Sequence, residues 1–195
     1  SPELRAKYTG IALHKAQRLE ELINEFFDIT RFSLSHLALS KQEVNLSRML
    51  EQLTYEFQPL LVEKELSWTL ELAPNVRVLC DPDKLERVFD NLFRNAVHYS
   101  YGQTAIAVRL EQTGTQVAVR VENRGKTIPP EKLGQIFEQF FRLDSARGTT
   151  TGGAGLGLAI AKEIVELHGG TISAESQDER IAFTVRLPLA FQKNV

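Results

Sequence analysis

Cysteine, tryptophan and methionine each occur once in the 195 residues, and the lone cysteine is Cys80. A single cysteine excludes a disulfide framework within the chain and fits a reducing compartment. No apolar run approaches the roughly 18 residues that a membrane helix needs, and no signal peptide opens the sequence. The net charge is only −2, so the chain lacks the strongly basic character of a nucleic-acid-binding protein.

What the chain does have is the composition of an ordinary globular protein. Hydrophobic residues make up 43% of it and charged residues 25%, which excludes intrinsic disorder. The length allows one domain of usual size plus an appendage. The sequence begins Ser-Pro-Glu, without methionine, and enters a helical pattern at once, so we expect a piece of something longer.

One long amphipathic helix is predicted over residues 3–39. Apolar and small residues recur there at alternating spacings of four and three, which is typical of a helix that packs on another helix. The partner is expected in another segment or subunit, although packing against the following domain would also bury this face. The stripe consists of Ala12, Ala16, Leu19, Ile23, Phe26, Thr30, Ser33 and Leu37.

From residue 41 onward the sequence combines helices with pairs of strands. Ser47 and Asp81 are the predicted N-caps of the first two helices, with Pro82 at the first helical position of the second. Because strand and helix do not alternate regularly, we expect an α+β two-layer sandwich, a mixed sheet covered by helices on one face. The predicted strands are 43–46, 66–72, 76–79, 104–111, 116–122, 171–176 and 181–187, and the helices 47–63, 82–99 and 156–168.

Three glycines alternate at Gly153, Gly155 and Gly157, directly before the last predicted helix. Glycine lets backbone N–H groups approach an anion closely, and the helix start presents its positive dipole end to that anion. The segment therefore predicts a phosphate site. Taken alone the pattern is weak, because glycine-rich turns precede helices in many folds.

Asn91 and Asn95 stand four residues apart in a predicted helix, so their carboxamides share one face. A carboxamide oxygen is a neutral ligand, suited to Mg²⁺ whose charge is balanced by nucleotide phosphates. His98 and Tyr99 extend that edge by one turn and could reach phosphate or ribose. The plain alternative is a pair of surface asparagines.

A third segment, Asn123-Arg-Gly-Lys-Thr-Ile-Pro129, follows directly on a predicted strand. A side chain at a strand end, followed by a glycine turn, can hold a base edge in a fixed pocket. A bare turn without any ligand would have the same sequence pattern.

A fourth segment places three phenylalanines before the polar stretch 144–153. We expect Phe137, Phe140 and Phe141 to anchor one end of that stretch. Arg142 and Arg147 could then reach phosphate oxygens with bidentate geometry. The alternative is core phenylalanines and solvated arginines.

In this order the segments resemble the N, G1, F and G2 boxes of the ATP-binding domain of sensor histidine kinases, in the fold shared with gyrase, Hsp90 and MutL. The resemblance covers residues 41–190, and the set of motifs is highly specific. Three stretches are similar to VanS-type kinases of vancomycin resistance. They are Glu25-Phe-Phe-Asp-Ile-Thr-Arg31, Asp81-Pro-Asp-Lys-Leu85 and Phe141-Arg-Leu-Asp-Ser-Ala-Arg147.

The resemblance implies ATP and Mg²⁺ as ligands, with Asn95 and Asn91 binding the metal and a lid over residues 144–154. It also implies transfer of the ATP γ-phosphoryl group to a histidine. The implied ATP-binding residues are Asn91, Asn95, His98, Tyr99, Asn123, Gly125, Thr127, Ile128, Arg142, Arg147, Gly153, Gly155, Leu156, Gly157 and Leu158.

Two positions depart from the family pattern. Asn123 stands where the family usually has an aspartate that accepts from the adenine amino group, and Thr127 replaces a glycine. Because the asparagine is uncharged, we expect its hydrogen bond to adenine to be weaker by about 1 kcal/mol than that of an aspartate. We therefore expect Asn123→Asp to tighten ATP binding. An alternative is a degenerate module of the same fold that acts through protein contacts. A second alternative is a protein of the same ATP-binding fold that acts on a different substrate, as serine-directed anti-sigma kinases do. The long first helix argues against this alternative.

The phosphoacceptor motif of the family, His-Asp/Glu-x-x-x-Pro, is absent, and none of His14, His36, His98 and His168 fits it. Residues 1–40 therefore resemble the second helix of the dimerisation hairpin, and residues 41–195 the ATP-binding domain. We predict no catalytic residue here, and a chain that binds ATP without phosphorylating itself. The implied partners are a second kinase subunit and a response regulator, with no nucleic acid and no direct membrane contact. The resemblance places this part in the cytoplasm, within a membrane-anchored bacterial sensor kinase.

Overall fold

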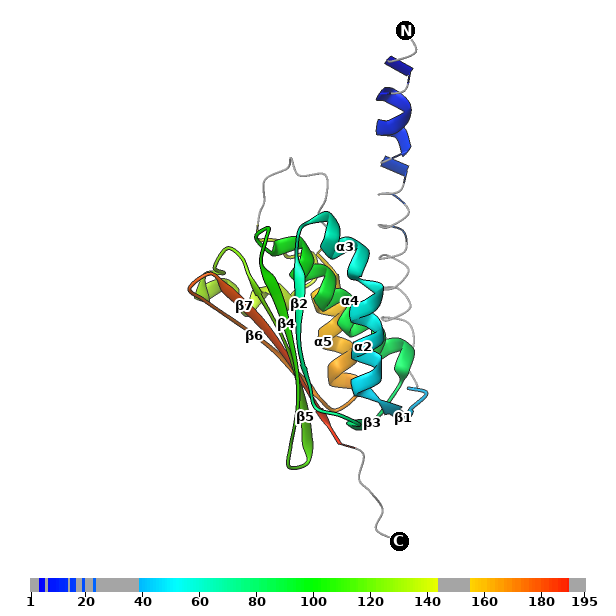
Figure 1. The fold of residues 1–195 in the computed structure, drawn as a ribbon, viewed down its shortest axis with the longest axis vertical. Coiled ribbons are helices and arrows are strands. Elements are labelled where there is room, and N and C mark those ends of the chain that lie inside the picture. Colours follow the sequence, from blue (N-terminus) through cyan, green and yellow to red (C-terminus); the bar gives the residue numbers. More distant parts are fainter. Residues whose placement is uncertain are drawn as a thin grey trace.

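The chain folds into two layers, a mixed β-sheet and a layer of helices on one of its faces (Figure 1). The computed structural model describes residues 4, 5, 7–13, 15, 16, 19, 23, 39–143 and 155–189. This architecture confirms the α+β sandwich predicted from the sequence. In chain order the elements are β1 (Gln42–Asn45), α2 (Leu46–Glu56), α3 (Gln58–Glu63), β2 (Ser67–Leu72), β3 (Arg77–Cys80), α4 (Pro82–Tyr99), β4 (Ala105–Thr113), β5 (Gln116–Arg124), the 3₁₀ turns η1 (Pro130–Lys132) and η2 (Gln135–Phe137), α5 (Gly157–Leu167), β6 (Thr171–Gln177) and β7 (Arg180–Pro188).

The main sheet has the strand order β2-β4-β5-β7-β6. β2 and β4 run parallel, which requires a crossover connection, and α4 lies in that crossover. The remaining neighbours are antiparallel, and β4–β5 and β6–β7 are hairpins. β1 and β3 form a separate antiparallel pair. Parallel pairing on one side therefore makes the sheet mixed.

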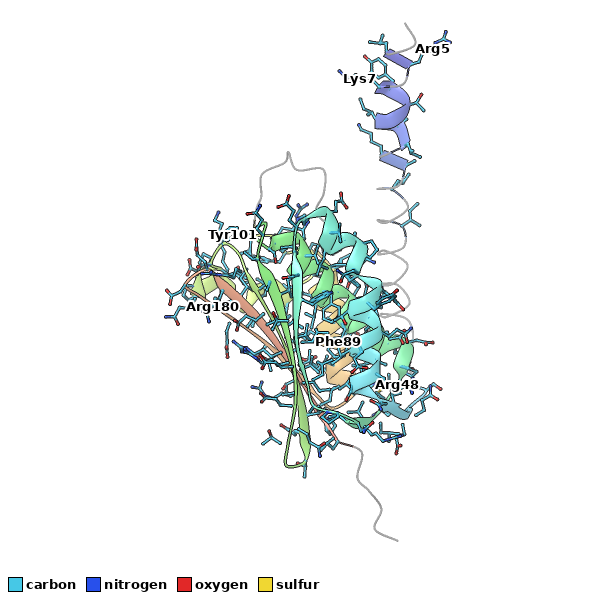
Figure 2. All side chains as sticks on the ribbon, in the orientation of Figure 1. Arg5, Lys7, Arg48, Phe89, Tyr101 and Arg180 are labelled. Atoms are coloured by element: carbon cyan, nitrogen blue, oxygen red, sulfur yellow. The ribbon has the colours of Figure 1, made fainter. Side chains whose placement is uncertain are left out.

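The core lies between the sheet and the helices α2, α4 and α5, and Figure 2 shows Phe89 of α4 in this layer. On β5 the alternate residues Val117, Val119 and Val121 are at most 1% exposed, because every second side chain of a strand points to the same face. Burying a side chain of this size contributes about 1.5–3 kcal/mol. The sheet and helices are thus held together by apolar burial.

α4 begins where the sequence predicts. Oδ1 of Asp81 accepts the N–H of Lys84 at 3.3 Å, and Pro82 is the first helical residue. The helix carries Asn91 and Asn95 in its second half. Its buried apolar residues recur every three or four positions, and they are Leu85, Val88, Phe89, Leu92, Phe93, Ala96 and Val97.

Two predictions for the first helix of this domain are wrong. The N-cap of α2 is Asn45, whose Oδ1 accepts the N–H of Arg48 at 3.1 Å. Ser47 is buried instead, with its hydroxyl donating to Ala73 at 2.7 Å and accepting from the N–H of Val76 at 3.0 Å.

The helix also does not continue to Glu63 without a break. It ends at Glu56, and the separate helix α3 begins at Gln58. Pro59 stands in the first turn of α3, where its missing N–H costs nothing, whereas within one continuous helix it would remove a backbone hydrogen bond.

The predicted helix over residues 3–39 is described at residues 4, 5, 7–13, 15, 16, 19 and 23, all of them helical. The remaining residues between 3 and 38, His14 among them, lie outside the described part. Arg5 and Lys7 stand apart from the sandwich in Figure 2. Among the described residues, no helix is both long enough and apolar enough to cross a bilayer.

A buried histidine joins the end of α5 to the start of α4. His168 is 4% exposed, and its Nε2 accepts the N–H of Asp81 at 3.0 Å. Its Nδ1 therefore carries the proton and donates to the carbonyl of Ile164 at 2.7 Å. Oδ2 of Asp81 in turn accepts the N–H of Ser40 at 3.0 Å. Because one ring nitrogen accepts and the other donates, this position holds the neutral imidazole.

We expect the folded domain to lose stability on mild acidification through His168. Burial lowers the pKa of His168, so the unfolded chain takes up the proton near pH 6.5 and the folded protein only at lower pH. Its contribution to the free energy of unfolding is therefore fully present above about pH 6.5 and declines as the pH falls below that value. Urea titrations from pH 7.5 to pH 5 measure this decline.

The variant His168→Gln should flatten the decline and cost about 1 kcal/mol at pH 7 for the lost hydrogen bond. The control His98→Gln changes an exposed histidine whose pKa is also lowered, and it should leave in place the part of the decline that belongs to His168. A pH dependence of His168→Gln equal to that of the wild type would contradict the assignment.

Candidate functional site

α4 and α5 approach each other closely at the start of α5. A Cβ added to Gly157 would lie 3.0 Å from Oδ1 of Asn91. Asn95 follows one turn later on the same half-buried side of α4. A side chain at position 157 would therefore press on the carboxamide of Asn91. The structure brings Asn91 and Gly157 together.

The N-terminus of α5 is suited to an anion. The helix spans 11 residues, and its N-cap Leu156 makes no side-chain capping hydrogen bond. Its first N–H groups thus have no capping side chain, and the positive end of the helix dipole lies there. Gly155 has φ +80°, a left-handed conformation that favours glycine, and a Cβ on it would lie 2.8 Å from the carbonyl oxygen of Phe141.

The phenylalanine segment packs against this glycine segment. The N–H of Phe140 donates to the carbonyl of Gly155 at 3.0 Å. Phe137 meets Phe183 edge-on at 6.3 Å between ring centroids, and Phe141 is half-buried, so both pack against the core, as the prediction requires of anchors. Phe140 does not, because it is 65% exposed and its backbone has φ +64°. The prediction of three anchors is wrong for Phe140, whose left-handed backbone directs the ring away from the core.

The turn after β5 lies against the last turn of α4. A Cβ on Gly125 would lie 2.3 Å from the carbonyl oxygen of Tyr99. The N–H of Tyr101 donates to the carbonyl of Arg124 at 2.8 Å. The third predicted segment therefore joins the same group as the asparagine helix.

The connection between β6 and β7 holds this turn, a role that the sequence did not indicate. Asp178 and Glu179 in that connection have φ of 50° and 58°, as in a tight hairpin turn, but Glu179 stands where such turns usually have glycine. Its partners lie about 50 residues away in sequence, so no local pattern predicts them. The hydrogen bonds are Gly125 N–H to Glu179 O (2.9 Å), Ile128 N–H to Ser176 Oγ (2.9 Å) and Glu179 N–H to Thr127 Oγ1 (2.9 Å).

Two buried carboxamides at these segments have an unpaired nitrogen. Asn123 continues the core-facing alternation of β5 and is 2% exposed. In the described part of the chain, Nδ2 of Asn123 and Nδ2 of Asn91 are buried without a hydrogen-bond partner. Buried donors in native proteins nearly always have partners. Two unpaired amides beside converging glycines therefore indicate groups kept for a ligand.

Positive charge gathers at the end of α4. His98 and Tyr99 are exposed there, with rings edge-on at 4.7 Å between centroids. Partial burial lowers the pKa of His98, and the charges of Lys64 and Arg142 lower it further. Nζ of Lys64 donates to the carbonyls of Val97 at 2.9 Å and His98 at 3.2 Å. These charges favour an anion near the end of α4.

The remaining predicted residues lie in the core or outside the described part of the chain. Ile128 is 4% exposed and Leu156 is 3% exposed, so both belong to the core, and Leu158 packs against it half-buried. Arg147, Gly153 and the whole of the predicted lid over 144–154 lie outside the described residues.

A divalent cation at this site would depend on carboxamide oxygens. Within the described residues, no three or more His, Cys, Asp or Glu side chains come together as a metal cluster. Oδ1 of Asn91 lies at the start of α5, and Asn95 is half-buried on the same side. Such neutral ligands suit Mg²⁺ when phosphates supply the negative charge. The residues present fit a magnesium ion that arrives with a nucleotide.

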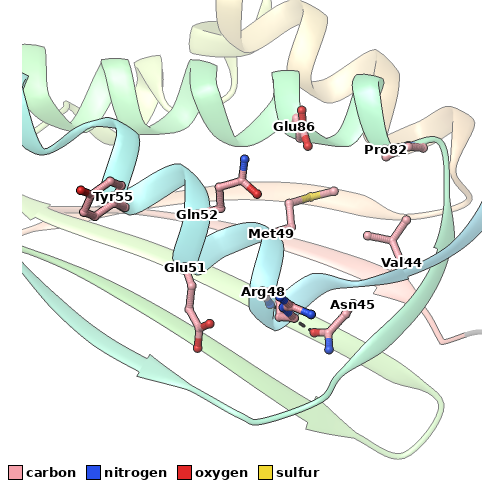
Figure 3. Close-up of a pocket in the computed structure, with 9 residues that line it drawn as sticks. All are labelled: Val44, Asn45, Arg48, Met49, Glu51, Gln52, Tyr55, Pro82 and Glu86. Atoms are coloured by element: carbon pink, nitrogen blue, oxygen red, sulfur yellow. Dashed lines mark hydrogen bonds between the residues drawn. The ribbon is translucent and has the colours of Figure 1, made fainter.

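A separate groove of about 530 Å³ lies between β1, α2 and the start of α4 (Figure 3). Its lining contains none of the predicted site residues. Arg48, Glu51 and Glu86 give it mixed charge. The converging segments at the start of α5, and not this groove, form the candidate site.

The chain is similar to several known proteins. The family described as "Histidine kinase-, DNA gyrase B-, and HSP90-like ATPase" matches residues 80–191. Sensor protein VanSC of Enterococcus gallinarum is 55% identical over 188 residues, 96% of this chain and 52% of that protein. Sensor protein VanS of Enterococcus faecium is 48% identical over 184 residues, 94% of this chain and 48% of that protein. The chain thus spans about half the length of these relatives.

Among solved structures, histidine kinase ThkA in complex with response regulator protein TrrA matches with a TM-score of 0.80 and 28% identity. That match covers 100% of this chain and 54% of the ThkA chain.

We expect Gly125→Ala to destabilise the domain by about 1–3 kcal/mol, because the added Cβ would overlap a backbone oxygen that cannot move freely. The distance of 2.3 Å to Tyr99 O leaves no room for a methyl group. Urea unfolding measures the loss.

The control is Gly134→Ala, where an added Cβ meets nothing within 4 Å and the backbone is helical with φ −72°. This variant should be as stable as the wild type or slightly more so. Equal stability of Gly125→Ala and Gly134→Ala would show that the turn does not press on α4.

Proposed function

The chain belongs to the family of histidine kinase-, DNA gyrase B- and HSP90-like ATPases, and from this premise we propose that it is the ATP-binding catalytic part of a two-component sensor histidine kinase. The proposed reaction transfers the γ-phosphoryl group of ATP to a histidine outside residues 1–195, for relay to a response regulator. One observation carries this proposal. The unpaired amides of Asn91 and Asn123 flank glycines that hold α4, α5 and the turn after β5 in contact.

We assign the parts of a nucleotide to different elements. Phosphates suit the start of α5, where Gly155, Leu156 and Gly157 present backbone N–H groups and a dipole. Asn95, with Asn91 beside it, would hold Mg²⁺, which supplies charge stabilisation when it is bound. The adenine suits the turn after β5, beside the buried amide of Asn123.

Further residues border these positions. Gly125, Thr127 and Ile128 shape the turn that we assign to the base. His98, Tyr99 and Arg142 stand at the end of α4, where positive charge favours phosphate or sugar. Arg147, Gly153 and Leu158 complete the proposed binding set.

Phosphoryl transfer needs few reacting side chains, because catalysis depends on positioning and charge stabilisation. The protein's own groups would therefore bind and orient the triphosphate and exclude water from it. A degenerate module without nucleotide binding is less well supported, because the hydroxyl of Thr127 accepts a hydrogen bond that builds the turn. This departure from the family pattern is part of the structure of the turn.

We extend the proposal to the domains, partners and location of the whole protein. Residues 1–40 would form the second helix of a dimerisation hairpin, paired with a second subunit, and residues 41–195 the ATP-binding domain. A response regulator is the proposed acceptor, and the structural relative ThkA is a histidine kinase in complex with one. We place this part in the cytoplasm, within a membrane-anchored bacterial sensor of vancomycin-resistance signalling, on the likeness to VanSC and VanS.

We expect residues 1–195 to bind ATP in calorimetry, more tightly with Mg²⁺ than with EDTA. Asn95→Ala should weaken binding about tenfold in Mg²⁺, equivalent to about 1.4 kcal/mol, and should remove most of the difference between Mg²⁺ and EDTA. The control Glu86→Ala changes an exposed residue near the other end of α4 and should bind as the wild type does. Mg²⁺ dependence that persists in Asn95→Ala would remove this residue from the proposed metal site.

We also expect no stable label on residues 1–195 after incubation with γ-labelled Mg·ATP, because the histidines present lack the acceptor motif. Acid and base stability of any label, followed by mass spectrometry, identifies the labelled residue type. Stoichiometric phosphorylation of His14 would contradict the proposal that the acceptor lies outside this sequence.

A further inference from the structure

The carboxamide of Asn123 is the exceptional polar group of the turn after β5. It is 2% exposed, and its Nδ2 is buried without a partner in the described structure. The backbone explains its position, because it continues the core-facing alternation of Val117, Val119 and Val121. A strand that is apolar on this face thus ends in a buried donor that the protein itself leaves unpaired.

Other polar groups of the same turn are already engaged. The N–H groups of Gly125 and Ile128 and the hydroxyl of Thr127 all hydrogen-bond to the β6–β7 hairpin and its connection. These bonds fix the shape of the turn but offer nothing to a ligand. The Asn123 amide is the buried group of the turn that is left to contact a base.

We propose that Asn123 makes the base site tolerant at position 6 of the purine, so that 6-oxo purines bind nearly as well as 6-amino purines. This inference rests on the proposed function, that the site binds a purine nucleotide. A carboxamide carries both an acceptor oxygen and a donor NH₂, whereas a carboxylate only accepts. Adenine offers a 6-amino donor, and hypoxanthine offers a 6-oxo acceptor in the same place.

Rotation of the amide by 180° exchanges its oxygen and nitrogen. Because Nδ2 of Asn123 has no hydrogen bond in the protein, that side of the amide has none to lose on rotation. The oxygen can then accept from a 6-amino group, or the nitrogen can donate to a 6-oxo group. An aspartate at this position would accept from the amino group more strongly and would repel the oxo group.

The test is calorimetric titration of residues 1–195 with ADP and with inosine diphosphate, both with Mg²⁺. Diphosphates avoid phosphoryl transfer, and inosine lacks the 2-amino group of guanosine, so the two bases differ only at the 6-substituent and at N1, which accepts in adenine and carries a proton in hypoxanthine. For the wild type we expect the two Kd values to lie within about fivefold of each other. Asn123→Asp should widen their ratio at least tenfold, by tightening ADP and weakening inosine diphosphate.

Asn75→Asp is the matched control, because it makes the same chemical change at an exposed asparagine between β2 and β3. Its ratio should equal that of the wild type. Asn123→Ala, which has neither donor nor acceptor, should weaken both nucleotides and leave their ratio small. Circular dichroism and thermal unfolding check that each variant is folded.

Each outcome decides a different point. A wild type that prefers ADP by more than 100-fold overturns the tolerance, whether or not any variant folds. An unchanged ratio in folded Asn123→Asp overturns the role of Asn123. If the wild type binds neither diphosphate and also fails to bind ATP, the proposed function itself fails. Binding of both diphosphates, with a ratio that Asn123→Asp widens, supports the proposal.

Discussion

The site depends on close approach at three glycines. At Gly125, Gly155 and Gly157 a neighbouring carbonyl or carboxamide oxygen lies 2.3, 2.8 and 3.0 Å from the position that a Cβ would occupy. Each contact joins segments that are remote in sequence, namely the end of α4 with the turn after β5, the phenylalanine segment with the start of α5, and Asn91 with α5 itself. The contacts at Gly125 and Gly157 hold the turn after β5 and the start of α5 against α4, the helix that carries Asn91.

The apolar core and the polar site share the same elements. β5 buries three valines toward the helices and then, with unchanged alternation, buries Asn123. α4 likewise buries Phe89 and Phe93 while its neighbouring side carries Asn91 and Asn95. The apolar residues provide the stability that offsets the cost of buried, unpaired amides. Rules of local consistency are commonly broken at sites of function, as they are here.

Local signals in the sequence predicted most of the fold. The capping residue and the proline after it predicted the start of α4. The alternation of apolar and polar residues predicted the strands, and the spacing of the glycines and asparagines predicted the segments of the candidate site. Contacts across the chain decided the rest. Asn45 and Ser47 are both good N-caps, but the hydroxyl of Ser47 is taken up by the connection between β2 and β3. Similarly, Ser176 and Glu179 carry no local pattern that relates them to a turn about 50 residues earlier.

The hairpin of β6 and β7 has a consequence for the order in which the domain can assemble. During synthesis α4 and β5 leave the ribosome before β6 and β7, yet the bonds that shape the turn after β5 come from the later hairpin. The turn after β5 therefore cannot take its final shape until the last hairpin has formed. A nucleotide bound at this turn, as proposed, would by mass action stabilise only molecules in which the last hairpin has closed.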